Sequence, residues 1–441
     1  MANVEVKGYN PPPSTAKERY TIEINLYFDG TLNNMNNTKA REAGNVNHKH
    51  FLAHGKNKKE DTSYYNDWSN VARLFEQCKE SSNRIYVEGI GTSNNGGDKL
   101  LGYALGVGAT GVRAKVRRGC ELVAELIEVK RKQNAGKELQ SVKLNVFGFS
   151  RGAAAARNFT AELVQRAYQA RYMDGFFVDR DGMTCQRDMP ESGHLGFQLK
   201  QKGIPFTMGL FTVNFLGVFD TVSSHGASFN DDIAELRLNH LSAAKRIVHL
   251  TANDEIRENF SLTRVPRGIE KGLPGVHSDV GGSYVTGKEV IKEIETSWTL
   301  KSNLNPYIEK LVNEGWYTRD QLTITGGNVY WALQGKKDKV HKEYSYIPLH
   351  FMAQFSVNNT VPTNQRSLLS KYSLQKFPTL ISAKENLRKY VFEGAAYPYG
   401  TNAGANRIAE LHDLRMNYFH RSARRENFGM QPTRNWKRKV F

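Results

Sequence analysis

The sequence contains few cysteines and no long apolar run. Its three cysteines among 441 residues, Cys78, Cys120 and Cys185, are far apart and form no Cys-x-x-Cys pair. This spacing argues against a disulfide framework and against a zinc ribbon. The simplest interpretation is a protein that folds in a reducing cytoplasm.

Membrane-spanning and secretory segments are also missing from the pattern. No run of about 18 apolar residues occurs, so we expect no transmembrane helix. Residues 1–13 lack the apolar stretch of a signal peptide, and Pro11, Pro12 and Pro13 block both helix and strand. We therefore interpret residues 1–20 as a flexible arm.

Acidic residues are outnumbered by basic ones. There are 61 lysines and arginines against 44 aspartates and glutamates, a formal net charge of +17. This balance suits an anionic partner such as nucleic acid, an anionic lipid surface or an acidic protein, although a merely solvated basic surface is an equal alternative. Because the charge is spread rather than gathered in one groove with aromatic residues, we expect no nucleic-acid partner.

The apolar content is sufficient for a large core. Hydrophobic residues make up 39% of the chain and aromatic residues 11%. Given this length, we expect one large domain with insertions. We place it at residues 21–288, with insertions near 36–64 and 171–205, and we interpret 289–441 as a cap or insertion followed by C-terminal helices.

One stretch has the pattern of a catalytic turn. Residues 148–152 read Gly-Phe-Ser-Arg-Gly, a G-x-S-x-G match, after the alternating segment 142–147 and before an alanine-rich helix. A strand, a sharp turn and a helix form the setting of a nucleophile elbow, in which Ser150 would stand at a helix N-terminus. The plain alternative is a tight turn with a capping serine.

Strands and helices alternate on both sides of this turn. We predict strands at 20–28, 84–88, 142–147, 211–219, 246–250 and 272–276, and helices at 66–78, 102–133, 232–245, 289–299, 306–314 and 411–419. This order predicts a mostly parallel sheet covered on both faces, the α/β-hydrolase type of architecture. Such sheets place their chemistry in loops at the carboxyl ends of the strands.

A serine nucleophile needs a histidine base and an acid that orients it. His277 ends a predicted strand and is followed by Asp279, Gly281 and Gly282, an open loop that suits a base. His225 is a possible base because it is near Asp220. His350, His412 and His420 are later alternatives, whereas His240 and His249 suit structural roles.

Two aspartates compete for the role of the acid. Asp220 ends the strand after the elbow helix, and Asp254 ends the next strand, which is the commoner position in this fold. The chain order Ser150, Asp220, His277 is the order expected of α/β-hydrolases. We favour Asp220 and keep Asp254 as the alternative acid.

The oxyanion hole should include the N–H of Arg151, the residue after the nucleophile. Its second donor should come from the loop after the strand that ends at Phe28, and there Gly30 or Thr31 is the candidate. No cofactor is expected. We also expect no metal, because nothing rigid frames His48, His50 and His54, and because Asp179, Asp181 and Gly182 form only a fragment of a calcium loop.

At this point the sequence resembles a family. Four motifs occur in order over roughly residues 20–285: Tyr-Phe-Asp-Gly-Thr-Leu-Asn-Asn (27–34), Gly-Phe-Ser-Arg-Gly-Ala-Ala (148–154), Gly-Val-Phe-Asp-Thr-Val (217–222) and Gly-Val-His-Ser-Asp-Val-Gly-Gly (275–282). Together they resemble the α/β-hydrolase domain of bacterial type VI secretion phospholipase effectors of the G-x-S-x-G kind.

The resemblance implies a Ser150–Asp220–His277 triad and hydrolysis of phospholipid acyl esters, of the A1 or A2 type. It implies synthesis in a bacterial cytoplasm, delivery without a signal peptide by the type VI apparatus, and action at target-cell membranes from the periplasm. The implied partners are membrane phospholipid, a cognate immunity protein, and a secretion spike or adaptor.

Two other classes remain open, namely a different serine esterase or acyltransferase and a non-catalytic binding module. A deep apolar acyl channel would favour lipid, and a polar pocket would favour the other esterases.

Overall fold

A computed structural model describes residues 17–55, 63–99, 111–179, 183–223, 233–234, 236–427 and 429–441. Several sequence predictions fall outside these residues: most of the N-terminal arm, the start of the helix predicted at 102, the calcium-loop residues Asp181 and Gly182, and the alternative base His225.

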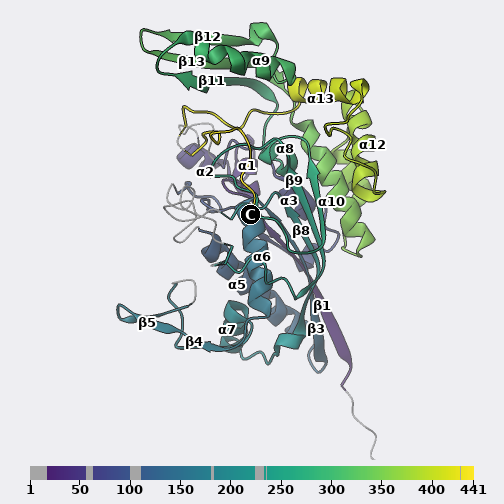
Figure 1. Cartoon of the computed structure of the whole chain (residues 1–441). Helices are drawn as coiled ribbons and strands as arrows, with labels where there is room; N and C mark the ends of the chain where they lie inside the picture. The colour runs from purple at the N-terminus through teal and green to yellow at the C-terminus, as the bar shows by residue number, and fades with distance from the viewer. Residues whose placement is uncertain are drawn as a thin grey trace, which may run out of the picture.

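A six-stranded parallel sheet forms the centre of the molecule (Figure 1). Its strands lie in the order β10 (Ile269–Leu273), β9 (Ala244–Ala252), β8 (Phe211–Phe219), β3 (Glu138–Phe149), β1 (Arg19–Phe28) and β2 (Arg84–Val87). Every neighbouring pair is parallel. The carboxyl ends of all six strands therefore meet at one edge, as the alternating pattern predicted.

Helices cover both faces of this sheet, and the pleat divides the core between them. On one face Tyr27 and Phe147 stack with ring centroids 4.9 Å apart, in a cluster with α3 (Asn70–Glu76) and α10 (Tyr346–Asn358). On the other face Leu26 and Val146 pack with α5 (Val112–Gln133) and α6 (Arg151–Leu163). The mainly parallel α/β sheet architecture is thus as the sequence predicted.

A second, antiparallel sheet projects from this body at the top of Figure 1. Its strand order is β11 (Gly287–Ser297), β13 (Tyr330–Val340) and β12 (Leu322–Gly327), and α9 (Asn305–Asn313) packs beside it. Helices α11, α12 and α13 follow α10 along the chain, at Gln365–Lys371, Pro378–Phe392 and Ala405–Asn417.

The remaining elements are short. The helices are α1 (Met35–Ala40), α2 (His48–His50), the π-helix η1 (Phe51–Gly55), α7 (Gly193–Gln201) and α8 (His277–Gly281). Two small ribbons pair β4 (Tyr168–Gln169) with β7 (Asp188–Met189), and β5 (Arg171–Met173) with β6 (Phe176–Val178). The 3-10 turns are η2 (Ser81–Asn83), η4 (Met208–Leu210), η5 (Lys301–Leu304), η6 (Arg319–Gln321) and η7 (Lys342–Ser345).

Two predicted helices are wrong. The segment 289–299 lies mostly in strand β11, and the described part of 232–245 forms turns that lead into β9. Part of the insertion predicted near 36–64 packs into the protein, since Asn37, Thr38 and Tyr64 are buried. The domain boundary near residue 288 stays a prediction, although α10, from beyond that boundary, covers one face of the central sheet.

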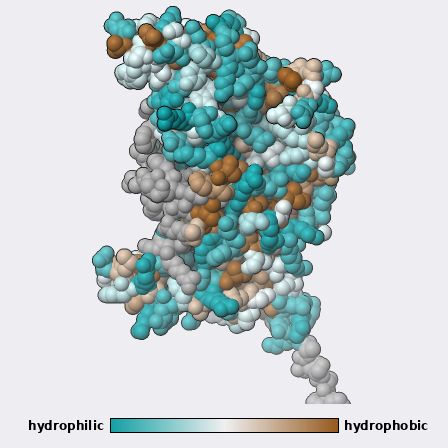
Figure 2. All heavy atoms as spheres, in the orientation of Figure 1, coloured by the Kyte–Doolittle hydropathy of each residue, from teal (hydrophilic) through white to brown (hydrophobic). Residues whose placement is uncertain are grey.

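The C-terminal segment 431–441 lies along residues 256–264. Backbone N–H groups of Glu258, Leu262 and Arg264 donate to the carbonyls of Gln431, Lys439 and Phe441 at 2.9, 2.9 and 2.8 Å. In Figure 2, apolar residues gather near the middle of the face that the view shows, where Figure 1 marks the end of the chain.

Among the described helices none is long and apolar enough to span a bilayer.

Candidate active site

The Gly-Phe-Ser-Arg-Gly segment forms a strained turn between β3 and α6. Ser150 has φ +59° and ψ −130°, a conformation that is costly for a residue with a side chain. The turn is fixed by the sheet, because the Ser150 N–H donates to the Phe219 carbonyl of β8 at 3.1 Å. The strand, the turn and the helix therefore hold Ser150 in the setting that the sequence predicted.

Both glycines of this segment are required by close backbone approach. A Cβ on Gly148 would lie 2.5 Å from the Gly152 carbonyl oxygen. A Cβ on Gly152 would collide with the carbonyl of Asp29, in the loop after β1. Gly148 thus lets β3 and α6 approach each other within the elbow, and Gly152 lets the elbow pack against the Asp29 loop.

The structure brings His277 and Asp220 together. Asp220 follows β8, and His277 begins α8, which follows β10. His277 Nδ1 lies 2.5 Å from Asp220 Oδ2, and because a carboxylate can only accept, the Nδ1–H donates. The imidazole packs against Phe149 and Phe260, with ring centroids 4.6 and 5.0 Å away.

Asp220 is fully buried and has further partners. Its Oδ1 accepts the Ala252 N–H at 2.9 Å, and Arg438 donates to both carboxylate oxygens, at 2.7 and 2.9 Å. Burial by itself raises the pKa of Asp220, but Arg438 and His277 outweigh that effect and lower it well below 3.8. Asp220 is therefore ionised across the physiological range.

His277 is held in its neutral form. Desolvation is the largest effect on its pKa and lowers it below 6.5, against the opposing influence of Asp220. A buried neutral imidazole with a fixed Nδ1–H presents Nε2 as the proton acceptor.

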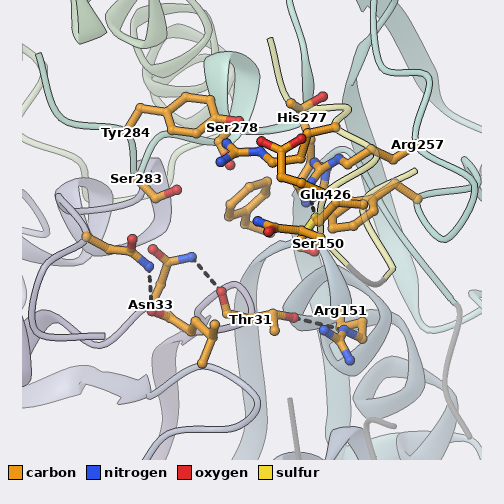
Figure 3. A pocket seen from close by; sticks show the side chains of 18 residues that line it. Thr31, Asn33, Ser150, Arg151, Arg257, His277, Ser278, Ser283, Tyr284 and Glu426 are labelled. Carbon is orange, nitrogen blue, oxygen red and sulfur yellow. Dashed lines mark hydrogen bonds between the residues drawn. The ribbon is translucent and has the colours of Figure 1, made fainter. Parts of the chain in front are cut away.

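The Asp29-Gly30-Thr31 loop lies against the elbow. Asp29 is buried and accepts from Ser69 Oγ at 2.5 Å, Tyr86 Oη at 2.5 Å and the Gly30 N–H at 2.7 Å. Burial raises the pKa of Asp29 to about 6. The Arg151 Nε donates to Thr31 Oγ1 at 2.9 Å and joins this loop to the first residue of α6 (Figure 3).

Ser150 and His277 face one cavity of about 410 Å³ (Figure 3). Thr31, Arg151 and Phe260 also line it. The rest of the wall is mainly polar and includes Asn33, Asn66, Arg257, Ser278, Ser283, Ser422, Arg424, Glu426 and Asn427, with Leu32, Phe149, Tyr284 and Met430 as the apolar part.

Asp254 is not brought to the imidazole. Its carboxylate accepts the Gly275 N–H at 2.7 Å and an Arg415 N–H at 2.6 Å, so it fastens α13 to the loop before α8.

The other predicted histidines have separate partners. His249 contacts Glu270 and the Thr221 N–H, His350 contacts the Tyr372 carbonyl, and His420 contacts Asp279. His240 is exposed, and His412 packs beside Gly315. Within the described part of the chain no group of three or more His, Cys, Asp or Glu side chains suits a metal ion.

Residues 23–302 match the family described as "T6SS, Phospholipase effector Tle1-like, catalytic domain". This match covers more than half of the chain. The chain belongs to this family. No curated protein matches this Tle1-like phospholipase effector.

Two solved structures are similar to this Tle1-like effector. The "Structure of the Tle1 effector bound to the VgrG spike from the Type 6 secretion system" has a TM-score of 0.61 and 20% identity over 100% of this chain and 98% of that chain. An uncharacterized protein from Pseudomonas aeruginosa has a TM-score of 0.42 and 19% identity over 90% of this chain and 52% of that chain. At 20% identity, the first likeness concerns the fold alone.

Sequence reasoning missed three groups of this Tle1-like site. Arg438 contacts Asp220, and Phe260 packs on His277. The Glu255 carboxylate accepts a hydrogen bond from the backbone N–H of His277 at 3.3 Å. None of them belongs to the four motifs. The sequence signal for Arg438 is only the general excess of basic residues, which does not distinguish a buried arginine from an exposed one.

Proposed function

We propose that this Tle1-like effector is a serine hydrolase of the α/β-hydrolase class that cleaves phospholipid acyl esters. Ser150 is the nucleophile, His277 the base and Asp220 the acid that orients it. The proposal depends mainly on the 2.5 Å hydrogen bond between Asp220 and His277, together with the cavity that His277 and Ser150 both line.

In the proposed reaction, Ser150 Oγ attacks the acyl carbonyl carbon while His277 Nε2 takes the hydroxyl proton. Asp220 stabilises the imidazolium, which then gives its proton to the departing lysophospholipid oxygen. Water attacks the acyl-enzyme, with His277 again acting as the base, and releases the fatty acid. The sequence of steps needs no metal.

The Arg151 N–H and a second N–H of the Asp29 loop form the proposed oxyanion hole. Because the Gly30 N–H donates to Asp29, the Thr31 N–H is the better second donor. Loss of one such donor raises the activation barrier by about 3–4 kcal/mol.

We extend the proposal to the setting of the reaction. The chain would be made in the bacterial cytoplasm, carried by a secretion spike or an adaptor, and act on target-cell membranes from the periplasm, while an immunity protein protects the producer. Support for a spike partner comes from the similar Tle1 effector, whose structure is bound to the VgrG spike.

The decisive experiment is fatty-acid release from phosphatidylethanolamine and phosphatidylglycerol vesicles. We expect release by the wild type and its loss in Ser150→Ala, with Ser278→Ala, a serine that lines the same cavity, as the matched control. Lipids labelled at one acyl position would then distinguish A1 from A2 cleavage. Equal release by the wild type and Ser150→Ala would overturn the proposal.

A second candidate function is hydrolysis of small, polar acyl esters. It is favoured by the wall of the cavity, where polar side chains outnumber apolar ones. Turnover of short-chain esters that Ser150→Ala abolishes, without release from vesicles, would favour this candidate. A non-catalytic binding module would require that neither substrate is turned over.

A further inference from the structure

The C-terminal segment inserts an arginine beside the proposed catalytic acid. The Arg438 side chain is only 6% exposed, and its Nη1 and Nη2 donate to Oδ1 and Oδ2 of Asp220 at 2.7 and 2.9 Å. Nη1 also donates to the Ala252 carbonyl at 3.0 Å, and Nε donates to the Phe260 carbonyl at 2.8 Å. All three nitrogens of the guanidinium are therefore used.

The backbone around Arg438 is fixed as firmly as its side chain. The Leu262 N–H donates to the Lys439 carbonyl at 2.9 Å, and the Phe441 N–H donates to the Leu262 carbonyl at 2.8 Å. Further back, the Thr433 N–H donates to the Ile256 carbonyl at 2.9 Å. The segment thus runs along the loop that carries Phe260, the aromatic ring that packs on His277.

We infer that Arg438 is a positioning residue, which fixes the orientation of the Asp220 carboxylate and offsets part of its negative charge during the reaction. The inference rests on the proposed function of Asp220 and His277. A bidentate arginine–carboxylate pair resists rotation of the carboxylate, so Oδ2 stays aimed at His277 Nδ1. Without Arg438, Asp220 would keep one hydrogen bond to each oxygen, from the Ala252 N–H to Oδ1 and from His277 to Oδ2, and would lose the bidentate contact that restrains both oxygens together.

The charge of Arg438 also affects the base. Several charged or titratable groups face this pair: Arg438 from the C-terminal segment, Glu255 and Arg257 from the loop after β9, and His249 from β9. Removing the Arg438 cation leaves the negative charge of Asp220 uncompensated next to the imidazole. The imidazolium form then becomes more favourable, and the pKa of His277 rises.

The experiment compares two variants. Arg438→Met removes the charge and the hydrogen bonds, whereas Arg438→Lys keeps the charge and loses the bidentate contact with Asp220. Lys437→Met is the matched control, because Lys437 is exposed and adjacent in sequence. Circular dichroism and thermal melting establish that each variant is folded.

Two readouts are used. The first is kcat and the pH dependence of kcat/KM on a soluble ester. The second is the low-field proton NMR signal of the His277 Nδ1–H, assigned by its loss in His277→Gln and titrated to give the pKa of His277.

For Arg438→Met we expect kcat to fall about 10- to 100-fold, as when an outer partner of an active-site group is lost. The pKa of His277 should rise by about one unit, and the acid limb of kcat/KM should move with it. Arg438→Lys should lower kcat without moving the acid limb, and Lys437→Met should match the wild type. A further variant, Arg438→Ala, leaves space for a free guanidinium beside Asp220, so added methylguanidine should restore part of its activity.

An unchanged His277 titration in folded Arg438→Met, or an unchanged kcat in Arg438→Lys, would overturn the inference. The same follows if the variants lose activity only in proportion to the loss of folded protein. If Arg438→Met does not fold, the kcat of Arg438→Lys and the methylguanidine test decide. The NMR titration requires no turnover. Failure of the proposed function, seen as an inactive wild type, can therefore be distinguished from failure of the inference about Arg438, seen as an unchanged His277 titration.

Discussion

Asp220 and Asp254 follow neighbouring strands but have different partners. Asp220 contacts the imidazole and Arg438, whereas Asp254 contacts Gly275 and Arg415. Only Asp220 is placed to fix the tautomer of His277. Asp220 directly follows β8, whereas the catalytic acid of this fold more commonly follows the next strand. The direct contact with His277 nevertheless favours Asp220 as the proposed acid.

Substitution of each aspartate by asparagine tests which of the two is the catalytic acid. We expect Asp220→Asn to lower kcat by about 10⁴-fold, because an amide no longer selects the productive tautomer. Asp254→Asn is the matched control and should leave kcat nearly unchanged. Initial rates on a soluble ester at pH 8 provide the measurement, and a greater loss in Asp254→Asn would reverse the assignment.

The acid limb of the pH–rate profile reports the base. Desolvation lowers the pKa of His277 below 6.5, and the proposed reaction needs the neutral imidazole, so kcat/KM should be at its plateau at pH 8 and should fall on the acid side. The midpoint of this fall should lie below pH 6.5. A stopped assay between pH 4.5 and 8 checks this expectation, and a midpoint above 6.5 would contradict it.

At the scale of the residue, the sequence marks positions that lie at strand ends and in short motifs. Ser150, Asp220 and His277 have such local signals, and the last two do meet in space. Arg438 has none, because it is one of 61 lysines and arginines and lies 218 positions from Asp220. Only the folded chain identifies which cation is buried next to the acid.

At the scale of the element, the N-terminus of α6 packs closely against the loop after β1. A Cβ on Gly152 would strike the Asp29 carbonyl, whereas a Cβ on Gly287 at the start of β11 would meet nothing within 4 Å. Helix propensity alone favours alanine over glycine by about 1 kcal/mol. Packing therefore predicts that Gly152→Ala lowers the free energy of unfolding, whereas helix propensity predicts that it raises it.

We expect Gly152→Ala to lower the free energy of unfolding by about 1–3 kcal/mol, because packing outweighs propensity. It should also lower kcat, because the displaced loop carries Gly30 and Thr31. Gly287→Ala should change stability by less than about 0.5 kcal/mol. Urea unfolding measures both, and a stabilised Gly152→Ala would contradict the packing argument.

The two mispredicted helices have different physical reasons. In β11 the pairing with β13 shifts between Gly287 and Glu289 and again between Ile291 and Glu295, so the apolar residues do not alternate strictly. In the described turns of 236–243, the Leu236 and Leu238 carbonyls accept from buried Asn158 and Arg157. Side chains from α6 thus satisfy backbone groups that a helix would otherwise pair internally.

At the scale of the whole molecule, the order of strands and helices predicted the central sheet, and the segments beyond residue 289 gave a much weaker pattern. The apolar residues of the second sheet, such as Ile291, Ile294 and Leu333, join the same hydrophobic cluster as one face of the central sheet, a long-range packing that local periodicity does not reveal.

Some of the basic residues are internal: Arg257, Arg421 and Arg438 are all nearly buried. Arg257 and Arg438 pair with buried Glu255 and Asp220, so these internal pairs add nothing to the net charge of the exposed surface.

Buried carboxylates make the fold sensitive to acid. Burial disfavours the charged form of Glu255, but Arg257 outweighs that effect and lowers its pKa from 4.5 to about 2. Its stabilising contribution is present above pH 4.5 and is lost as pH falls through about 2, a change of about 3 kcal/mol. Asp29, whose pKa is raised to about 6, acts in the opposite direction between about pH 4 and 6.

We expect the free energy of unfolding to fall between pH 4.5 and 2.5, and to fall less steeply in Glu255→Gln. Glu258→Gln is the control, because Glu258 forms an exposed pair with Lys439. Urea unfolding at a series of pH values gives the slopes. Equal slopes for the wild type and Glu255→Gln would exclude this carboxylate as a source of acid lability.

The position of Arg438 along the chain affects the timing of synthesis. The ribosome makes the six sheet strands, Ser150, Asp220 and His277 well before residue 438. Until that arginine emerges, a nascent domain that has already folded around Asp220 contains a buried carboxylate with no cation beside it. Maturation of the acid–base pair would therefore be a late event, and partly synthesised chains would carry an incomplete hydrolase inside the cell that makes them.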